Sequence, residues 1–113
     1  MALNKKNRLK KKQDFEAVFK KSRAVNGSFL FVKYKKNELD TPRFGFVVSA
    51  KVAKKAVERN RIRRILSETI RGRVDNLGGY DIIVFATKKI IIAERKDVVE
   101  DFLAVLNKIW WKK

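Results

Sequence analysis

The sequence predicts an α+β protein: a two-layer sandwich with a mixed sheet, helices on one face, and the order α-β-β-β-α-β-α. Apolar residues recur at helical spacing in three stretches, and runs rich in aromatic and β-branched residues lie between those stretches. Hydrophobic residues make up 45% of the 113-residue chain, which suffices for a core. We therefore expect one compact domain over residues 13–113, preceded by a basic segment over residues 1–12.

The N-terminal segment, "MALNKKNRLKKK", holds six basic residues and no acidic one. Such a segment is either a solvated tail or one that becomes ordered against nucleic acid. The next stretch, "QDFEAVFKKS", predicts a short helix with Asp14 as its N-cap. Its apolar face is formed by Phe15, Val18 and Phe19, at positions i, i+3 and i+4.

Two of the three strands that precede the central helix can be assigned, over residues 28–35 and 43–49. A polar turn that ends in Pro42 separates them, so we expect them to pair as a hairpin. Strand alternation divides the first of them into two faces. One face carries Leu30, Val32 and Tyr34, and the other carries Phe29, Phe31 and Lys33.

The central helix is expected to run to about Arg71 and to stop at Gly72 as its C′ residue. The apolar run over residues 80–86 is typical of a strand buried on both faces. Strand 43–49, the central helix and strand 80–86 then form a crossover unit with parallel strands. The sequence does not decide whether the segment "KKIII" is the end of a strand or a loop. A closing amphipathic helix follows, with its apolar residues at Val98, Val99, Phe102, Leu103, Leu106, Ile109 and Trp110.

The net charge and the absent residue types limit the classes of function that this chain can have. The chain has 29 Lys and Arg residues against 12 Asp and Glu residues, a formal net charge of +17. That balance favours a polyanionic partner, with nucleic acid first and a membrane surface second. The chain contains neither Cys nor His, so thiolate chemistry, structural zinc and the usual general base are excluded. No apolar run of about 18 residues is present, so we expect no membrane span.

The central helix divides its surface between packing and cationic groups. Its packing stripe comprises Ile62, Ile65, Leu66, Thr69 and Ile70. A second stripe comprises Asn60, Arg64, Ser67 and Arg71, flanked by Arg59 and Arg63. Arg matches phosphate oxygens bidentately and stacks on bases. The alternative is a solvated face with intrahelical pairs such as Arg64 with Glu68.

The aromatic residues of the first helix and first assigned strand also admit two interpretations. Phe15 and Phe19 at i, i+4 are ordinarily core residues, and Tyr34 could likewise pack with its hydroxyl at the rim. If the helix and the sheet form the walls of a groove, the same rings beside Lys and Arg become a platform for a single strand.

Motifs along most of the chain resemble the bacterial ribonuclease P protein family. The run "FGFVVSAKVAKKAVERNRIRRILSE" matches its signature, R-N-x-x-[KR]-R-x-x-R-E on the central helix. "RLKKKQDFEAVFK" (8–20) resembles the family's first helix, and "GYDIIVFATK" (79–88) resembles its last strand. The block is matched by Arg59, Asn60, Arg63, Arg64 and Glu68. Ser67 departs from it, because the family usually has Arg there, so no contact is carried over to that position.

The resemblance implies a subunit that joins a catalytic RNA to cut the 5′ leader from precursor tRNA, with a rare left-handed crossover in its fold. It implies that the RNA and its Mg²⁺ perform the hydrolysis, so we expect no cofactor held by the protein and no catalytic residue in it. Expected partners are the catalytic RNA and precursor tRNA, with no membrane; the protein alone is expected to be monomeric and cytoplasmic.

The residues expected to serve these partners fall into two groups. The leader is expected to contact Phe15, Phe19, Phe31 and Tyr34. The catalytic RNA is expected to contact Lys51, Lys54, Lys55, Arg59, Asn60, Arg61, Arg63 and Arg64.

Two nucleic-acid-binding alternatives remain on composition alone. A structural RNA-binding protein of the ribosomal type fits the charge and fold class equally, but it explains neither the Arg–Asn block nor the aromatic platform. A basic architectural protein for duplex DNA is disfavoured, because neither a dimerisation helix nor a minor-groove wedge is evident.

Overall fold

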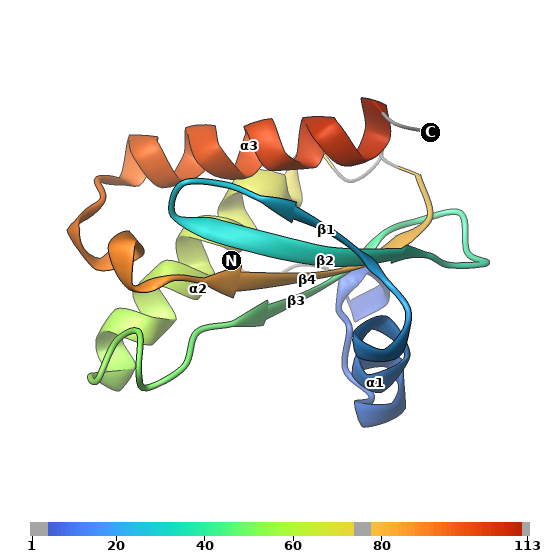
Figure 1. Cartoon of the computed structure of the whole chain (residues 1–113), viewed down its shortest axis with the longest axis horizontal. Helices are drawn as coiled ribbons and strands as arrows, with labels where there is room; N and C mark the ends of the chain where they lie inside the picture. Colours follow the sequence, from blue (N-terminus) through green and yellow to red (C-terminus); the bar gives the residue numbers. More distant parts are fainter. Residues whose placement is uncertain (1–4, 74–77, 112–113) are drawn as a thin grey trace.

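A computed structural model describes residues 5–73 and 78–111 (Figure 1). The expected order of helices and strands is confirmed, with a short 3-10 helix added at the start and another before the last helix. The elements are η1 (Lys5–Asn7), α1 (Lys12–Lys20), β1 (Arg23–Asn26), β2 (Leu30–Lys36), β3 (Arg43–Val47), α2 (Ala56–Arg71), β4 (Tyr80–Ala86), η3 (Lys88–Ile92) and α3 (Arg95–Trp111).

The sheet has four strands in the order β1-β2-β4-β3, so the predicted hairpin is wrong. The strand that turns back onto β2 is β1, which the sequence did not locate, and the two pair antiparallel. β4 lies between β2 and β3, antiparallel to the first and parallel to the second. Its position explains its composition: a central strand covered on both faces can be apolar at nearly every residue.

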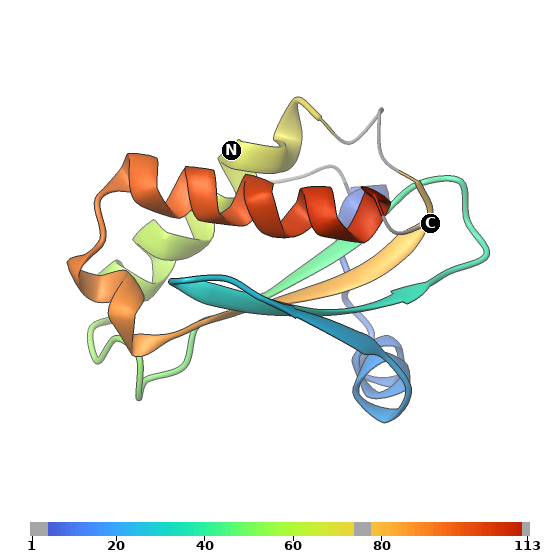
Figure 2. The same ribbon diagram turned by 45° about the horizontal axis from the view of Figure 1, so that its top comes forward.

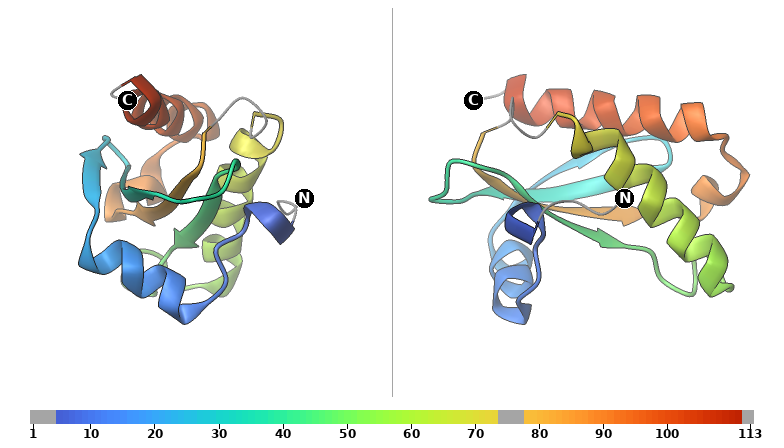
Figure 3. Two further views of the ribbon diagram at one scale, coloured as in Figure 1. Left: turned by 90° about the vertical axis from the view of Figure 1, so that its right-hand side faces the viewer. Right: turned by 180° about the vertical axis from the view of Figure 1, so that it is seen from behind.

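The predicted crossover is present: β3 runs into α2, and α2 leads back to β4, which is parallel to β3. With α2 nearer the viewer in the right-hand view of Figure 3 and the strands taken as pointing up, β4 lies to the left of β3. The connection is therefore left-handed, against the strong right-handed preference of such units.

The main core lies between the sheet and the two long helices. Figure 2 shows α2 and α3 covering the same face of the sheet. The largest fully buried side chains there include Phe44 from β3, Leu66 from α2 and Phe102 from α3. The packing stripes predicted for α2 and α3 are buried as expected, except that Val99 and Leu103 are half-buried. The side chain of Trp110, assigned to the same stripe of α3, lies outside the described part of the chain.

Helix α1 departs from the predicted single helical layer, because it packs on the other face of the sheet. A small second core joins it there, formed by Leu9, Val18 and Ile83, with Phe15 packed against them. Asp14 does not act as the N-cap: the helix begins at Lys12, and the Asp14 carboxylate reaches Arg43 instead.

The basic segment before α1 lies against the edge of the sheet. The amide of Leu9 donates to the Phe44 carbonyl at 2.8 Å, and Asn7 Nδ2 donates to the Pro42 carbonyl at 2.9 Å. Because both bonds join the segment to β3 and the turn before it, they fix the approach of the chain to α1.

Two other expectations concern element ends. α2 ends at Arg71 with Gly72 beyond it, but Gly72 has a φ of −86° and so does not use the left-handed conformation expected of a C′ glycine. The ambiguous "KKIII" segment forms η3, whose Ile90 is buried.

Candidate nucleic-acid interface

The sheet face that carries α1 presents a surface cluster of rings and one cation. Phe31 of β2 and Phe85 of β4 are cross-strand partners whose rings stack, with centroids 4.8 Å apart and planes 5° apart. Phe19 of α1 tilts against Phe85 at 6.0 Å and is 48% exposed. Lys33 Nζ lies 5.9 Å from the centroid of Phe19 and 5.8 Å from that of Phe85, within cation–π range. We call Phe19, Phe31, Lys33 and Phe85 the aromatic face.

The structure brings together three of the four residues predicted to contact the leader. Phe31 and Phe19 belong to the aromatic face, and Phe15 lies beside it, half-buried against the second core. Tyr34 does not join them. It points to the opposite side of β2, is 6% exposed and packs edge-to-face on Tyr80. The strand alternation already separated Tyr34 from Phe31, and placing both in one groove was inconsistent with it.

Sequence reasoning missed the other two members of the aromatic face. Lys33 shares the face of Phe31 by strand alternation, a signal that was available. Phe85 gave no such signal, because β4 is apolar at almost every position and its faces cannot be told apart from composition. Its partner strand was also misassigned, and only the observed register places Phe85 opposite Phe31.

Part of the Arg–Asn block fixes the loop that precedes α2. Arg59 Nη1 donates to the carbonyls of Ala53 and Lys54, at 2.9 and 2.8 Å. Arg63 donates to Asn60 Oδ1 at 3.1 Å and to the Val48 carbonyl at 3.4 Å. These guanidinium groups therefore satisfy loop carbonyls that have no strand partner, and they hold the loop against the helix.

The remaining predicted cations project outward. Arg61 and Arg64 are exposed on α2, and the three loop lysines, Lys51, Lys54 and Lys55, are exposed as well. Among the residues described, no ion pair involves any arginine of the Arg–Asn block. The block thus keeps its positive charge available to a partner.

Glu68, which the alternative interpretation of the helix pairs with Arg64, binds a different arginine. Its Oε1 accepts from Arg95 Nη2 of α3 at 2.7 Å. That hydrogen bond, helped by the nearby charges of Arg95, Arg71 and Arg64, lowers the pKa of Glu68 below its ordinary value. The pair joins α2 to α3 and leaves Arg64 free of a carboxylate.

A partly buried ion network sets the position of α1. Arg43 of β3 donates through Nε and Nη2 to the two oxygens of Asp81 in β4, at 2.9 and 2.7 Å. Its Nη1 also reaches Asp14 of α1 at 3.3 Å, and Asn37 donates to the same Asp81 carboxylate at 2.9 Å. The hydrogen bonds to Asp81 raise the pKa of Arg43 above its ordinary value. One bidentate arginine therefore ties helix α1 to the two strands beneath it.

The two groups of predicted contacts lie at opposite ends of β3. Its first residue, Arg43, contacts α1, and the strand then leads into the lysine-containing loop over residues 48–55. Figures 1 and 2 show α1 and this loop on the same side of the molecule, away from α3. The aromatic face therefore has α1 on one side and the start of α2 with its preceding loop on the other. We call this second region, which carries Lys51, Lys54, Lys55, Arg61 and Arg64, the cationic end of α2.

The groups on this surface are suited to binding single-stranded nucleic acid. Cations match phosphate oxygens, and exposed rings stack on unpaired bases whatever their sequence, at about 1–3 kcal/mol per base. Within residues 5–73 and 78–111, no group of three or more acidic side chains gathers as a metal site. In the same residues, no helix is long and apolar enough to cross a bilayer.

A four-stranded mixed sheet, a cationic helix end and an aromatic face beside it define a small basic protein of the nucleic-acid-binding class. Comparisons with known proteins identify its family. A family model described as Ribonuclease P matches residues 3–110. The ribonuclease P protein component of Pseudomonas syringae pv. tomato is 34% identical over 108 residues, covering 95% of this chain and 78% of the relative. That of Syntrophomonas wolfei is 35% identical over 109 residues, covering 94% and 89%.

Solved structures agree with the sequence relatives. The Staphylococcus aureus RNase P protein superposes with a TM-score of 0.85 and 30% identity, over 91% of this chain and 94% of that one. A Thermotoga maritima RNase P protein has a TM-score of 0.80 and 32% identity, over 88% and 96%. The chain belongs to the ribonuclease P protein family. It is therefore a protein subunit of the ribonuclease that processes the 5′ end of tRNA, and membership of the family implies partnership with the ribonuclease P RNA and tRNA.

Proposed function

We propose that this subunit holds the single-stranded 5′ leader of precursor tRNA on its aromatic face, while the catalytic RNA and its Mg²⁺ break the phosphodiester bond. The observation that carries the proposal is the position of Lys33. Its ammonium group lies near two rings of the aromatic face, so one site offers a phosphate contact beside two stacking surfaces. A duplex does not expose base faces to such rings, whereas an unpaired leader does.

Selectivity for the precursor follows from the same contacts. Mature tRNA has no leader, so every contact on the aromatic face stabilises the substrate complex and none stabilises the product complex. The subunit then contributes by differential binding, and it needs no reactive side chain of its own.

The cationic end of α2 suits the catalytic RNA. We propose that Arg61 and Arg64, with the loop lysines, contact its backbone, because these cations are exposed and have no carboxylate partner in the described residues. Arg59 and Arg63 act differently: they shape the loop that presents Lys51 and Lys54. Screening of repulsion between two RNAs would let Mg²⁺ bind at a lower concentration.

The geometry supports a narrower set of leader contacts than the sequence did. Phe19, Phe31, Lys33 and Phe85 are the proposed contacts, and Phe15 supports them from beneath α1. Tyr34 lies on the other face of the sheet and takes no part in the aromatic face. We further propose that the protein works in the cytoplasm as a monomer until it meets the RNA.

Reconstitution tests the proposal. The purified protein is mixed with a bacterial catalytic RNA and precursor tRNA at physiological ionic strength, and 5′ trimming is followed with time. We expect strong stimulation over the RNA alone and no cleavage by the protein alone. Robust phosphodiester cleavage by the polypeptide without RNA would refute the division of labour proposed here.

A further inference from the structure

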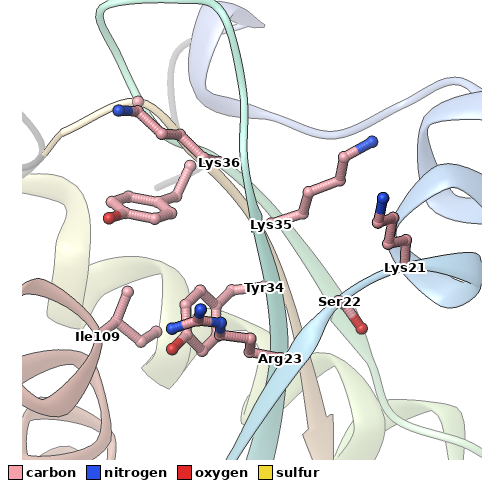
Figure 4. Close-up of a pocket in the computed structure, with 9 residues that line it drawn as sticks. Lys21, Ser22, Arg23, Tyr34, Lys35, Lys36 and Ile109 are labelled. Atoms are coloured by element: carbon pink, nitrogen blue, oxygen red, sulfur yellow. The ribbon is translucent and has the colours of Figure 1, made fainter. Parts of the chain in front are cut away.

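A second concave site lies on the other side of the sheet, at the end remote from η3. It is an open pocket of about 840 Å³ between the α1–β1 connection, the end of β2, the start of β4 and the last turns of α3. Figure 4 shows side chains from β1, β2 and α3 around it. Four of its lining residues are cations and two are tyrosines: Lys21, Arg23, Lys35, Lys36, Tyr34 and Tyr80.

The rim of this pocket is strongly positive. Its four cations are all exposed, and no acidic residue is among the lining side chains. The ion pairs among the described residues use Arg43 and Arg95 as their cations, so no carboxylate of the described residues neutralises a rim cation. In Figure 4 the ammonium ends of Lys21 and Lys35 extend to one side of β2, and Arg23 and Lys36 lie on the other side with Tyr34. A multiply charged anion is the ligand that this rim favours.

The floor of the pocket is aromatic and apolar. Tyr34 and Tyr80 are 6% and 9% exposed, and their rings meet edge-to-face at 5.9 Å. Arg23 is the direct cross-strand partner of Tyr34, so its guanidinium shares that face of the sheet. Ile109 of α3 completes the apolar side. An inorganic phosphate would leave such a floor unused, whereas a nucleotide would cover it with its base.

The pocket is also continuous along the chain with the aromatic face. Phe19, on that face, and Lys21, on the pocket rim, are separated by one residue at the end of α1. An extended strand leaving the aromatic face at this corner therefore meets the rim lysines next.

We propose that this pocket binds one nucleotide of single-stranded RNA, with its base on the tyrosine floor. One flanking phosphate contacts Lys36 on the same side of β2, and the other contacts Lys21 and Lys35 across the end of the strand (Figure 4). Two sources supply that chemistry: an upstream nucleotide of the leader or an unpaired nucleotide of the catalytic RNA. Only the leader source rests on the function proposed above.

The test compares two charge-matched variants. Lys35→Ala/Lys36→Ala removes two rim cations, and Lys88→Ala/Lys89→Ala removes two exposed cations at the far end of β4. Because all four side chains are exposed, both variants should melt at the wild-type temperature. One arm measures holoenzyme affinity for precursor tRNA with a long leader and with a leader too short to pass Lys21. The other arm measures protein affinity for the catalytic RNA.

We expect the rim variant to bind about tenfold more weakly in one arm and the control variant to change much less. The salt-dependence slope in that arm should fall by about 1.4, or about 0.7 for each single-strand phosphate that is no longer neutralised. Weakening confined to the long leader assigns the nucleotide to the leader, and weakening in the second arm assigns it to the catalytic RNA. If the two variants show equal affinities in both arms, the proposal that this pocket binds a nucleotide is wrong.

Photocross-linking separates this inference from the proposed function. Thiouridine placed along a single-stranded RNA should cross-link to the peptides that contain Tyr34 and Tyr80, and Lys35→Ala/Lys36→Ala should weaken that cross-link. This holds even if the protein fails to stimulate the catalytic RNA. Cross-links found only at Phe31 and Phe85 would contradict the pocket while supporting the aromatic face.

Discussion

The ring of Phe15 in α1 lies directly against the backbone of Gly45 in β3. A Cβ added at Gly45 would come within 2.6 Å of both Cε1 and Cζ of that ring. Only a residue without a side chain lets the helix approach this closely. The height of α1 above the sheet, and with it the position of Phe19, therefore depends on Gly45.

Replacement of this glycine should disturb both stability and leader binding. We expect Gly45→Ala to lower the free energy of unfolding by about 1–3 kcal/mol, because a methyl group overpacks the contact. Leader affinity should fall as α1 is displaced. Urea denaturation and precursor binding measure the two effects. Gly72→Ala is the matched control: its added Cβ would meet no non-neighbouring atom within 4 Å in the part of the chain that the structure describes, so it should be neutral or slightly stabilising. If Gly45→Ala has the stability and the precursor affinity of wild type, the position of α1 does not depend on Gly45.

The Arg43–Asp81 pair should be a main source of rigidity for α1. Asp81→Asn leaves the Arg43 guanidinium, with a side chain 24% exposed, facing a neutral amide in place of a bidentate carboxylate. We expect a destabilisation of about 1–3 kcal/mol, below the range for fully buried pairs because Arg43 keeps some access to water. Chemical denaturation measures it, and Asp40→Asn, at an exposed carboxylate, should change little. Equal stability of the two variants would rule out the network as the anchor.

The arginines of α2 should separate into two classes. Arg64→Ala and Arg61→Ala remove exposed charges, so the melting temperature should hold while holoenzyme activity falls more at low Mg²⁺ than at high Mg²⁺. Arg59→Ala leaves two loop carbonyls without their donor, so it should also cost about 1 kcal/mol of stability. Activity titrations against Mg²⁺, paired with thermal melts, check both. Equal activity losses at all Mg²⁺ concentrations would count against the screening role.

Acid should weaken the contact between α2 and α3. The hydrogen bond from Arg95 holds the pKa of Glu68 below its unfolded value, so its stabilising effect is present above that unfolded value. The effect is lost as pH falls through the lower, folded pKa. Glu68→Gln should therefore flatten the stability profile on the acid side, whereas Glu100→Gln, at an exposed position, should not. Denaturation midpoints over a pH series test this, and parallel profiles for Glu68→Gln and wild type would contradict it.

Much of the fold could be predicted from local patterns. The stripe of Ile62, Ile65 and Leu66 placed α2 on the sheet, and the apolar run over residues 80–86 indicated a central strand; both are confirmed. The pairing of β2 with β4 could not be predicted, because the two strands are more than forty residues apart in the chain. β1 was missed because "RAVN" has a single apolar residue facing the core, too little for a periodic signal.

The sequence indicated which residue types form the site, but it did not indicate how those residues are arranged on the surface. The Arg–Asn block was evident, yet the bonds of Arg59 and Arg63 to loop carbonyls depend on how that loop folds. Tyr34 and Phe31 were both expected to contact the leader, although strand alternation puts them on opposite faces of β2. Phe85 needed the register of β4, which no local pattern specifies.

The most direct test of the account is the ratio of holoenzyme affinities for precursor and mature tRNA. Phe19 and Lys33 lie at the surface of the aromatic face, and Phe19 is 48% exposed, so Phe19→Ala and Lys33→Ala should leave the fold intact. Phe19→Ala should weaken precursor binding by about 1–3 kcal/mol through the loss of a stacked ring, so that the ratio falls roughly tenfold. Lys33→Ala should also lower the ratio, through the loss of a phosphate contact, and both variants should leave mature tRNA binding unchanged. A ratio equal to that of wild type, in variants that melt normally, would contradict the claim that this face holds the leader.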